Sequence, residues 1–111
     1  MKLDRNLTYE EELVLNLIPK QKPVMKADVV DRQYIRQITG IKEREINNII
    51  EELRKYYPIC SSRGLGGYWL GNKAEALKFA EECRHHAEGL LETAKNIENM
   101  FPEDNDLTNF D

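Results

Sequence analysis

Long apolar runs are absent from this sequence. No stretch approaches the roughly 20 consecutive apolar residues that a membrane-spanning helix needs, and the first residues, Met1 to Asn6, lack the apolar segment of a signal peptide. Cysteine is also scarce: Cys60 and Cys83 are the two in the chain, and they form no CxxC pair. We therefore expect a cytoplasmic chain with reduced thiols, no membrane contact, and neither a disulfide framework nor a structural zinc site.

The residue sets of common active sites are missing as well. The sequence offers no Ser-His-Asp set, no phosphate-binding glycine loop and no paired carboxylates in a plausible cleft, so we expect neither catalysis nor a cofactor. Cys83, His85 and His86 are close in sequence, but only Cys83 and His86 share a helical face and no further ligand is near. We interpret them as surface residues rather than a metal site.

The length indicates a small soluble protein, and its charge is distributed unevenly along the chain. A chain of 111 residues is long enough for one domain, and 16 bases against 20 acids give a net charge of −4. Residues 20–63 carry 10 bases and 6 acids, a local charge of +4, whereas residues 64–111 carry 4 bases and 10 acids, a local charge of −6. The middle of the chain can therefore bind phosphate while the end repels it.

Apolar periodicity predicts a mainly α fold with a small β hairpin. Helices are expected over 9–18, 31–38, 42–57 and 72–101. Apolar residues recur in steps of three and four in the first, third and fourth of these, and the capping residues Thr8, Asp31 and Asn72 mark the starts of the first, second and fourth. A minor strand is expected over 27–30, and two strands over 59–63 and 68–70 around a glycine-rich turn. We divide the chain into an N-terminal arm (1–7), a domain (8–71), a C-terminal helix (72–101) and an acidic disordered tail (102–111), for which a docking peptide is the alternative.

Several segments together resemble winged helix-turn-helix DNA-binding domains, most closely small phage and prophage proteins of Gram-positive bacteria. They are Ile35-Arg36-Gln37-Ile38-Thr39-Gly40-Ile41, Arg44-Glu45-Ile46, Leu53-Arg54, Tyr57-Pro58-Ile59-Cys60-Ser61-Ser62 and Gly67-Tyr68-Trp69-Leu70. The resemblance implies a winged helix-turn-helix followed by a long C-terminal helix, with Gly40 in the turn. Arg36 replaces the usual small residue of the motif. Lys42 replaces the usual capping Ser or Thr of the recognition helix, a loss of about 1 kcal/mol.

The outward face of the 42–57 helix carries the predicted DNA contacts. With its isoleucines facing inward, Arg44, Asn47 and Asn48 are the expected readers of base edges, since Arg can donate two bonds to guanine and Asn can pair with adenine. Further contacts, to the DNA backbone, are expected from Lys42, Lys55 and Arg63 and from the wing residues Gly64 and Gly66. The alternatives are a merely solvated helix face, which the acids Glu51 and Glu52 favour, and glycines that simply close a hairpin.

The C-terminal helix is expected to pair with a second copy. Seven small or apolar residues form a heptad seam: Ala80, Cys83, Ala87, Leu90, Ala94, Ile97 and Phe101. Thirty residues would reach about 45 Å, beyond the about 28 Å of a compact domain of this size, so part of the seam would overhang and need a partner. A homodimer is the prediction. The alternative is a break at Gly89 into two helices that pack on each other.

Two functions from different classes follow. The first is a DNA-binding protein, resembling phage or prophage proteins, that acts in replication or transcription control by occupying a site on double-stranded DNA in the cytoplasm of the bacterium or host. The second is a protein-interaction module that uses the same fold to bind a host or phage replication protein without DNA contact. The net charge of −4 favours the second.

Overall fold

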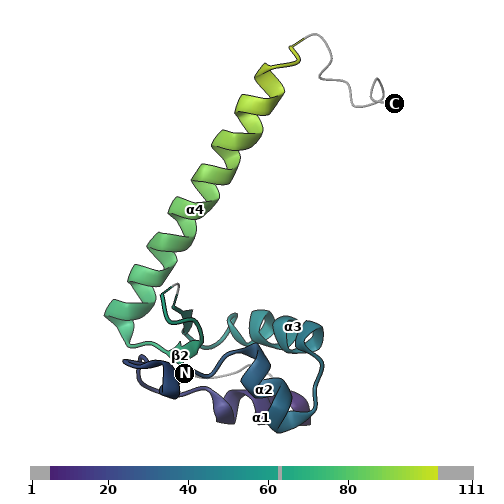
Figure 1. Ribbon diagram of the computed structural model, residues 1–111, viewed down its shortest axis with the longest axis vertical. Coiled ribbons are helices and arrows are strands. Elements are labelled where there is room, and N and C mark those ends of the chain that lie inside the picture. Colours follow the sequence, from purple (N-terminus) through teal and green to yellow (C-terminus); the bar gives the residue numbers. More distant parts are fainter. Residues whose placement is uncertain (1–5, 63, 103–111) are drawn as a thin grey trace. The chain divides into compact units, whose positions relative to one another are not determined.

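The computed structural model describes residues 6–62 and 64–102 and has the predicted fold class: mainly helical, with an antiparallel hairpin and a long C-terminal helix (Figure 1). It divides into two compact units, Met1–Phe79 and Ala80–Asp111, with the boundary inside the last helix. The elements, in order, are α1 (Tyr9–Leu17), the 3-10 turn η1 (Lys26–Asp28), α2 (Arg32–Thr39), α3 (Glu43–Leu53), β1 (Ile59–Ser61), β2 (Tyr68–Leu70) and α4 (Lys73–Asn99).

The first two helices begin where the capping residues predict. The Thr8 hydroxyl accepts from the Glu11 amide at 3.1 Å and the Glu11 carboxylate accepts from the Thr8 amide at 2.9 Å, a reciprocal capping box. The Asp31 carboxylate accepts from the Tyr34 amide at 2.9 Å and starts α2. Both starts confirm the prediction to within a residue.

A tight turn joins α2 to α3. Gly40 takes a left-handed backbone (φ 78°) that favours glycine, and its amide closes α2 on the Arg36 carbonyl at 2.8 Å. The Thr39 hydroxyl donates to the Ile35 carbonyl at 2.7 Å and accepts from the Ile41 amide at 3.1 Å. Because Ile41 is thereby turned into the core, the two helices are held as a helix-turn-helix.

Helix α3 is shorter than predicted. It ends at Leu53 rather than Tyr57, and the next residues form turns in which the Tyr56 amide bonds the Leu53 carbonyl at 2.9 Å. Pro58 explains the early end, because proline disfavours helical backbone in the residue before it and clashes with the carbonyl four residues earlier. The missing cap is confirmed: the Lys42 side chain makes no capping bond.

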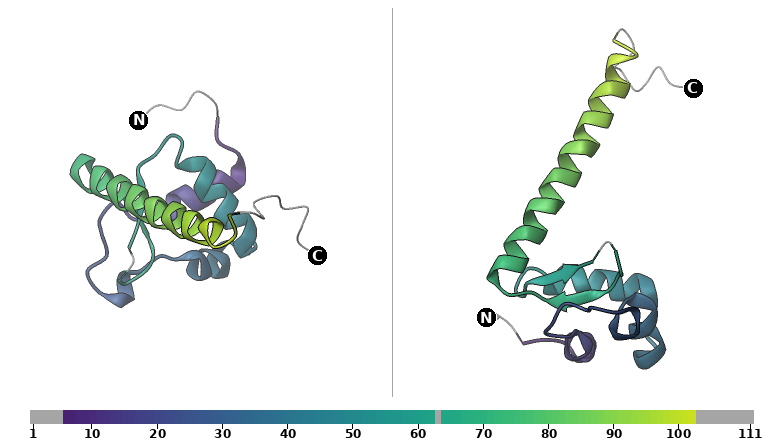
Figure 2. Two further views of the ribbon diagram at one scale, coloured as in Figure 1. Left: turned by 90° about the horizontal axis from the view of Figure 1, so that it is seen from above. Right: turned by 60° about the vertical axis from the view of Figure 1, so that its left-hand side comes forward.

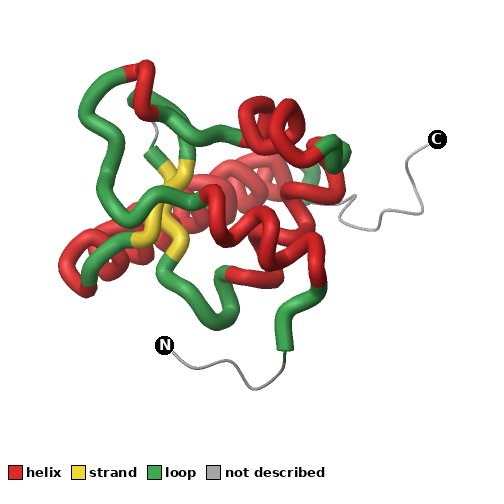
Figure 3. Tube along the Cα trace, turned by 90° about the horizontal axis from the view of Figure 1, so that it is seen from below, coloured by secondary structure: helices red, strands yellow, loops and turns green. Residues whose placement is uncertain are grey.

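The hairpin has the predicted place and an antiparallel register of Ile59 with Leu70, Cys60 with Trp69 and Ser61 with Tyr68. Figure 3 shows its two strands side by side in yellow.

The minor strand predicted over 27–30 is wrong. Lys26–Asp28 form a 3-10 turn, and the Val30 carbonyl meets β2 through one bond from the Tyr68 amide at 2.9 Å. The short apolar pair Val29-Val30 covers the edge of β2 without making a ladder, because the turn has already used the preceding residues.

The hydrophobic core lies between the three helices and β1. It contains a set of buried aliphatic side chains, contributed by α1, α2, the turn, α3 and β1 in that order: Val14, Ile18, Ile35, Ile41, Ile46, Ile50, Leu53 and Ile59. Isoleucines of α3 face inward at helical spacing, as the periodicity predicts. This core fixes α3 so that its opposite face is turned outward.

Helix α4 runs without a break, so the alternative of two helices that separate at Gly89 is wrong (Figure 2). Its start is capped as predicted: the Asn72 side chain accepts from the Glu75 amide at 2.9 Å, and Glu75 accepts from the Asn72 amide at 3.0 Å. At 27 residues the helix is about 40 Å long. Within residues 6–62 and 64–102, no helix combines the length and apolar character needed to cross a membrane.

Candidate nucleic-acid interface

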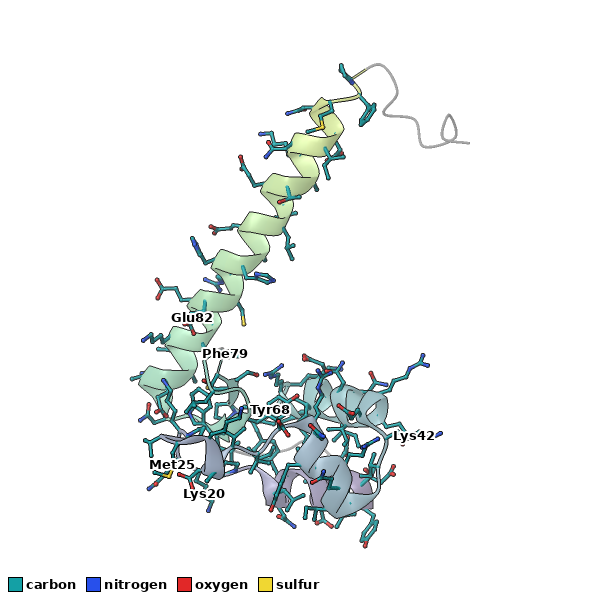
Figure 4. All side chains as sticks on the ribbon, in the orientation of Figure 1. Lys20, Met25, Lys42, Tyr68, Phe79 and Glu82 are labelled. Carbon is teal, nitrogen blue, oxygen red and sulfur yellow. The ribbon has the colours of Figure 1, made fainter. Side chains whose placement is uncertain are left out.

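Four of the predicted DNA-contacting side chains lie just before α3 or on its outward face. Lys42, Arg44, Asn47 and Asn48 are all exposed, and within the described part of the chain none of them has a side-chain partner. Figure 4 shows Lys42 at the edge of the domain, pointing away from it. A guanidinium and two amides, one helical turn apart, are therefore free to donate and accept toward a ligand.

The carboxyl-terminal half of α3 is electrically balanced. The Arg54 guanidinium donates to the Glu51 carboxylate at 2.9 Å, and the Lys55 ammonium donates to the Glu52 carboxylate at 3.0 Å. Lys55, predicted to bind phosphate, is therefore held by a neighbour one turn back. Its side chain is 65% exposed, so the ion pair contributes little to stability, and Lys55 can leave Glu52 at little cost in free energy.

The predicted wing residues are placed differently from one another. Gly64 is exposed and Gly66 is half-buried with φ 82°, while Arg63 lies outside the described residues. Gly67 makes the close approach: a Cβ there would lie 2.7 Å from the Val29 Cγ1 atom. Among the glycines between the two strands, the closely packed one is thus Gly67, whereas a Cβ at Gly64 would meet open space, which leaves Gly64 available for a contact.

Sequence reasoning assigned no role to Arg54, which joins α3 to the hairpin. Its Nε donates to the Ile59 carbonyl at 3.0 Å and its Nη2 to the Ser61 hydroxyl at 2.5 Å. The guanidinium carbon also lies 5.9 Å from the Tyr68 ring centre and 5.2 Å from the Phe79 ring centre. Arg54 therefore connects the end of α3 to both strands of the hairpin.

The aromatic side of this cluster comes from β2 of the hairpin and from the first turns of α4. Figure 4 shows Tyr68 and Phe79 on neighbouring segments. Burial raises the pKa of the Tyr68 phenol above its usual value, although the positive charges of Arg32 and Arg54 oppose the shift. Trp69, buried on the same strand, donates through Nε1 to the Glu75 carboxylate at 3.3 Å. Trp69 is buried and Tyr68 and Phe79 are half-buried, so these aromatic rings support the fold.

The predicted dimerisation residues form an exposed seam on α4. Every residue of the segment 80–102 is exposed, and the seven seam residues are among them: Ala80, Cys83, Ala87, Leu90, Ala94, Ile97 and Phe101. Within the described residues, no three His, Cys, Asp or Glu side chains gather as they would around a metal ion. Of the tail predicted to be disordered (102–111), residues 103–111 lie outside the described residues.

Comparison with family models, with curated proteins and with solved structures finds no match for this chain. Its function is therefore inferred from its residues and their arrangement.

Proposed function

We propose that this protein binds double-stranded DNA through the outward face of α3 and acts by occupying its site, without chemistry. The observation that carries the proposal is the group Arg44, Asn47 and Asn48, exposed on the second helix of a helix-turn-helix and without side-chain partners in the described part of the chain. In that motif the second helix enters the major groove with its first residues against the base edges. These three residues lie in the first half of α3.

The roles follow from the donors and acceptors of each group. Arg44 can donate two bonds to the O6 and N7 acceptors of guanine, and Asn47 or Asn48 can pair with adenine through both atoms of the amide. Lys42, just before the helix, and Lys55, once it leaves Glu52, would neutralise phosphates on either side. Gly64 would allow the wing to approach the backbone closely.

The proposal includes a homodimer formed through the seam on α4. Apolar side chains that are exposed at helical spacing need a partner, and alanines at Ala80, Ala87 and Ala94 let two helices approach closely. A two-fold dimer would present two copies of α3 to a palindromic or nearly palindromic site.

The test compares two exposed lysines from opposite ends of the domain, Lys42 and Lys20 (Figure 4). A preferred duplex is first selected from a random-sequence pool, and its affinity is measured by fluorescence anisotropy over a range of salt. We expect Lys42→Ala to weaken binding to every duplex and to make the salt slope shallower by about one, while Lys20→Ala changes neither. Arg44→Ala should weaken the selected duplex by about tenfold or more and relax its sequence preference.

Two results would contradict the proposal. No retention of any duplex at low salt would exclude a DNA-binding role. Equal losses for Lys42→Ala and Lys20→Ala would place the contact away from α3.

A protein partner is the second candidate, and a different group of residues favours it. Tyr34 and Ile38, one turn apart on α2, are 41% and 57% exposed, and the acids Glu43 and Glu45 at the start of α3 have no partner within the described residues. An exposed apolar pair on α2, with two acids on the next helix, suits a basic, amphipathic partner such as a segment of a replication protein. Loss of a nuclease-resistant interaction in Ile38→Asp, with DNA binding absent, would favour this function.

A further inference from the structure

We propose that two copies of α4 pair antiparallel, in one register centred on Glu92. The proposal rests on the homodimer in the proposed function and specifies its geometry. The starting point is the exposed seam of the second compact unit, in which Leu90, Ile97 and Phe101 are 59%, 52% and 45% exposed. A second copy of the helix is the occupant that its sizes and charges fit.

The side-chain volumes along the seam increase from its amino-terminal to its carboxyl-terminal half. Cys83, Ala87 and Ala94 are small, and Leu90, Ile97 and Phe101 are large. If two helices run antiparallel about Glu92, residues whose numbers add to 184 face each other. Cys83 then meets Phe101 of the second copy, Ala87 meets Ile97 and Leu90 meets Ala94. Each layer combines one small and one large side chain, which is how facing positions fill a core without voids.

The charges beside the seam fit the same register. Arg84, Leu91 and Glu98 follow the seam on one side, with Glu88 and Lys95 next to them. In the antiparallel pair Arg84 lies beside Glu98 of the second copy, offset by about 3 Å along the axis, and Lys95 lies beside Glu88, offset by about 1.5 Å. Because the pair is symmetric, each attraction occurs twice. Leu91 meets its own symmetry mate.

A parallel pair of helices fits less well, both in the sizes of the facing side chains and in the charges beside the seam. It stacks Ala87 on Ala87 and Ala94 on Ala94, and the voids beside these layers cannot close while Leu90 meets Leu90. The flanking positions across a parallel seam would be His86, Thr93 and Met100, which offer no opposite charge to Arg84. The neighbouring antiparallel register, one heptad away, pairs Cys83 with Ala94 and brings Arg84 close to Lys95.

The experiment is disulfide trapping in the full chain. In a Cys83→Ala background, where the remaining Cys60 is fully buried, three variants are oxidised: Ala87→Cys, Ile97→Cys and the two together. In the proposed register the thiol introduced at position 87 faces the thiol introduced at position 97 of the second copy, within the reach of a disulfide, whereas like positions lie about 15 Å apart along the axis. We expect at least about tenfold more covalent dimer from the double variant than from either single one, and peptide mapping should find the bond between positions 87 and 97.

Charge reversal gives an independent measurement by sedimentation equilibrium. Arg84→Glu replaces two attractions by two repulsions, and we expect the dissociation constant of the dimer to rise by about tenfold. Glu98→Arg in the same chain should restore it. This exchange of charges tests whether positions 84 and 98 pair between the two copies. If Arg84 and Glu98 only faced solvent, the second substitution would not restore the dissociation constant.

As much covalent dimer from either single variant as from the double variant, or a bond found mainly between like positions, would overturn the antiparallel register. A dimer in which the double variant forms no disulfide would overturn it too. DNA binding by the same proteins is measured separately: a monomer that still binds duplex DNA refutes the pairing alone, and a trapped dimer that binds none refutes the DNA function alone.

Discussion

Replacing Arg54 by alanine should be among the more destabilising single changes in the winged domain, the unit Met1–Phe79. Its side chain is 25% exposed and donates to the Ile59 carbonyl, the Ser61 hydroxyl and the Glu51 carboxylate. The bonds to Ile59 and Ser61 contribute about 1 kcal/mol each, and the exposed pair with Glu51 contributes about 0.5 kcal/mol. The two aromatic contacts contribute about 0.5 kcal/mol each. Because these terms share one side chain and do not add fully, we expect a loss of about 3 kcal/mol.

The assay is urea unfolding followed by fluorescence of Trp69, the one tryptophan of the chain, which is 5% exposed. Glu51→Ala is the matched control because it removes the exposed partner and leaves the bonds to the hairpin, so it should cost about 0.5 kcal/mol. Arg54→Lys should fall between the two, since an ammonium cannot reproduce the guanidinium fork. If Arg54→Ala costs no more than Glu51→Ala, Arg54 does not join α3 to the hairpin.

Three further changes can be measured by the same unfolding assay. Gly67→Ala should lower the free energy of unfolding by about 2 to 3 kcal/mol, because the new Cβ meets Val29 Cγ1 at 2.7 Å in a backbone of φ 83°. Gly66→Ala, at φ 82° in open space, should lower it by about 1 kcal/mol. Equal losses would exclude the close packing as the cause. Lys42→Ser should stabilise the domain by about 1 kcal/mol by supplying the missing cap of α3, while weakening DNA binding. Since the pKa of Tyr68 is raised in the folded state, the unfolded phenol loses its proton first, so the free energy of unfolding should fall as the pH rises above about 10 and should fall less in Tyr68→Phe.

Local chemistry made the helix starts predictable. Thr8, Asp31 and Asn72 each bond the backbone amide three residues later, an interaction within one turn that needs no other part of the chain. The same holds for Gly40, whose left-handed backbone is required by the turn itself. For this reason the order of elements and the exposed face of α3 follow from periodicity and caps.

Interactions between distant residues account for what sequence reasoning missed. Arg54 contacts Ile59, Ser61, Tyr68 and Phe79, and none of these partners lies at a spacing that marks a local motif. The strand expected at 27–30 failed for a related reason. A strand exists only where a neighbour supplies a ladder, and β2 supplies Val30 with one bond. Two β-branched residues indicate an extended backbone, but they do not show how many backbone hydrogen bonds a neighbouring strand will form with them.

The charge of α3 connects the two proposals. The segment 42–55 carries four bases, Lys42, Arg44, Arg54 and Lys55, and four acids, Glu43, Glu45, Glu51 and Glu52. A helix with no net charge gains little from the general field of DNA, so one protomer would hold the duplex through few phosphate contacts. With Lys42 and Lys55 as these contacts, the slope of log affinity against log salt would be about −2 for one protomer and about −4 for two on one duplex.

In the proposed homodimer, pairing through α4 would therefore decide whether DNA binding is strong. When one half of a dimer is bound, the other half meets the DNA at a high effective concentration, which multiplies the affinity without any new contact on α3. Arg84→Glu, which lies outside the winged domain, should then reduce the affinity for a selected palindromic duplex and bring the salt slope close to that of one protomer. A variant that sediments as a monomer yet keeps the affinity and slope of the unaltered chain would show that a single α3 suffices and that the seam serves another purpose.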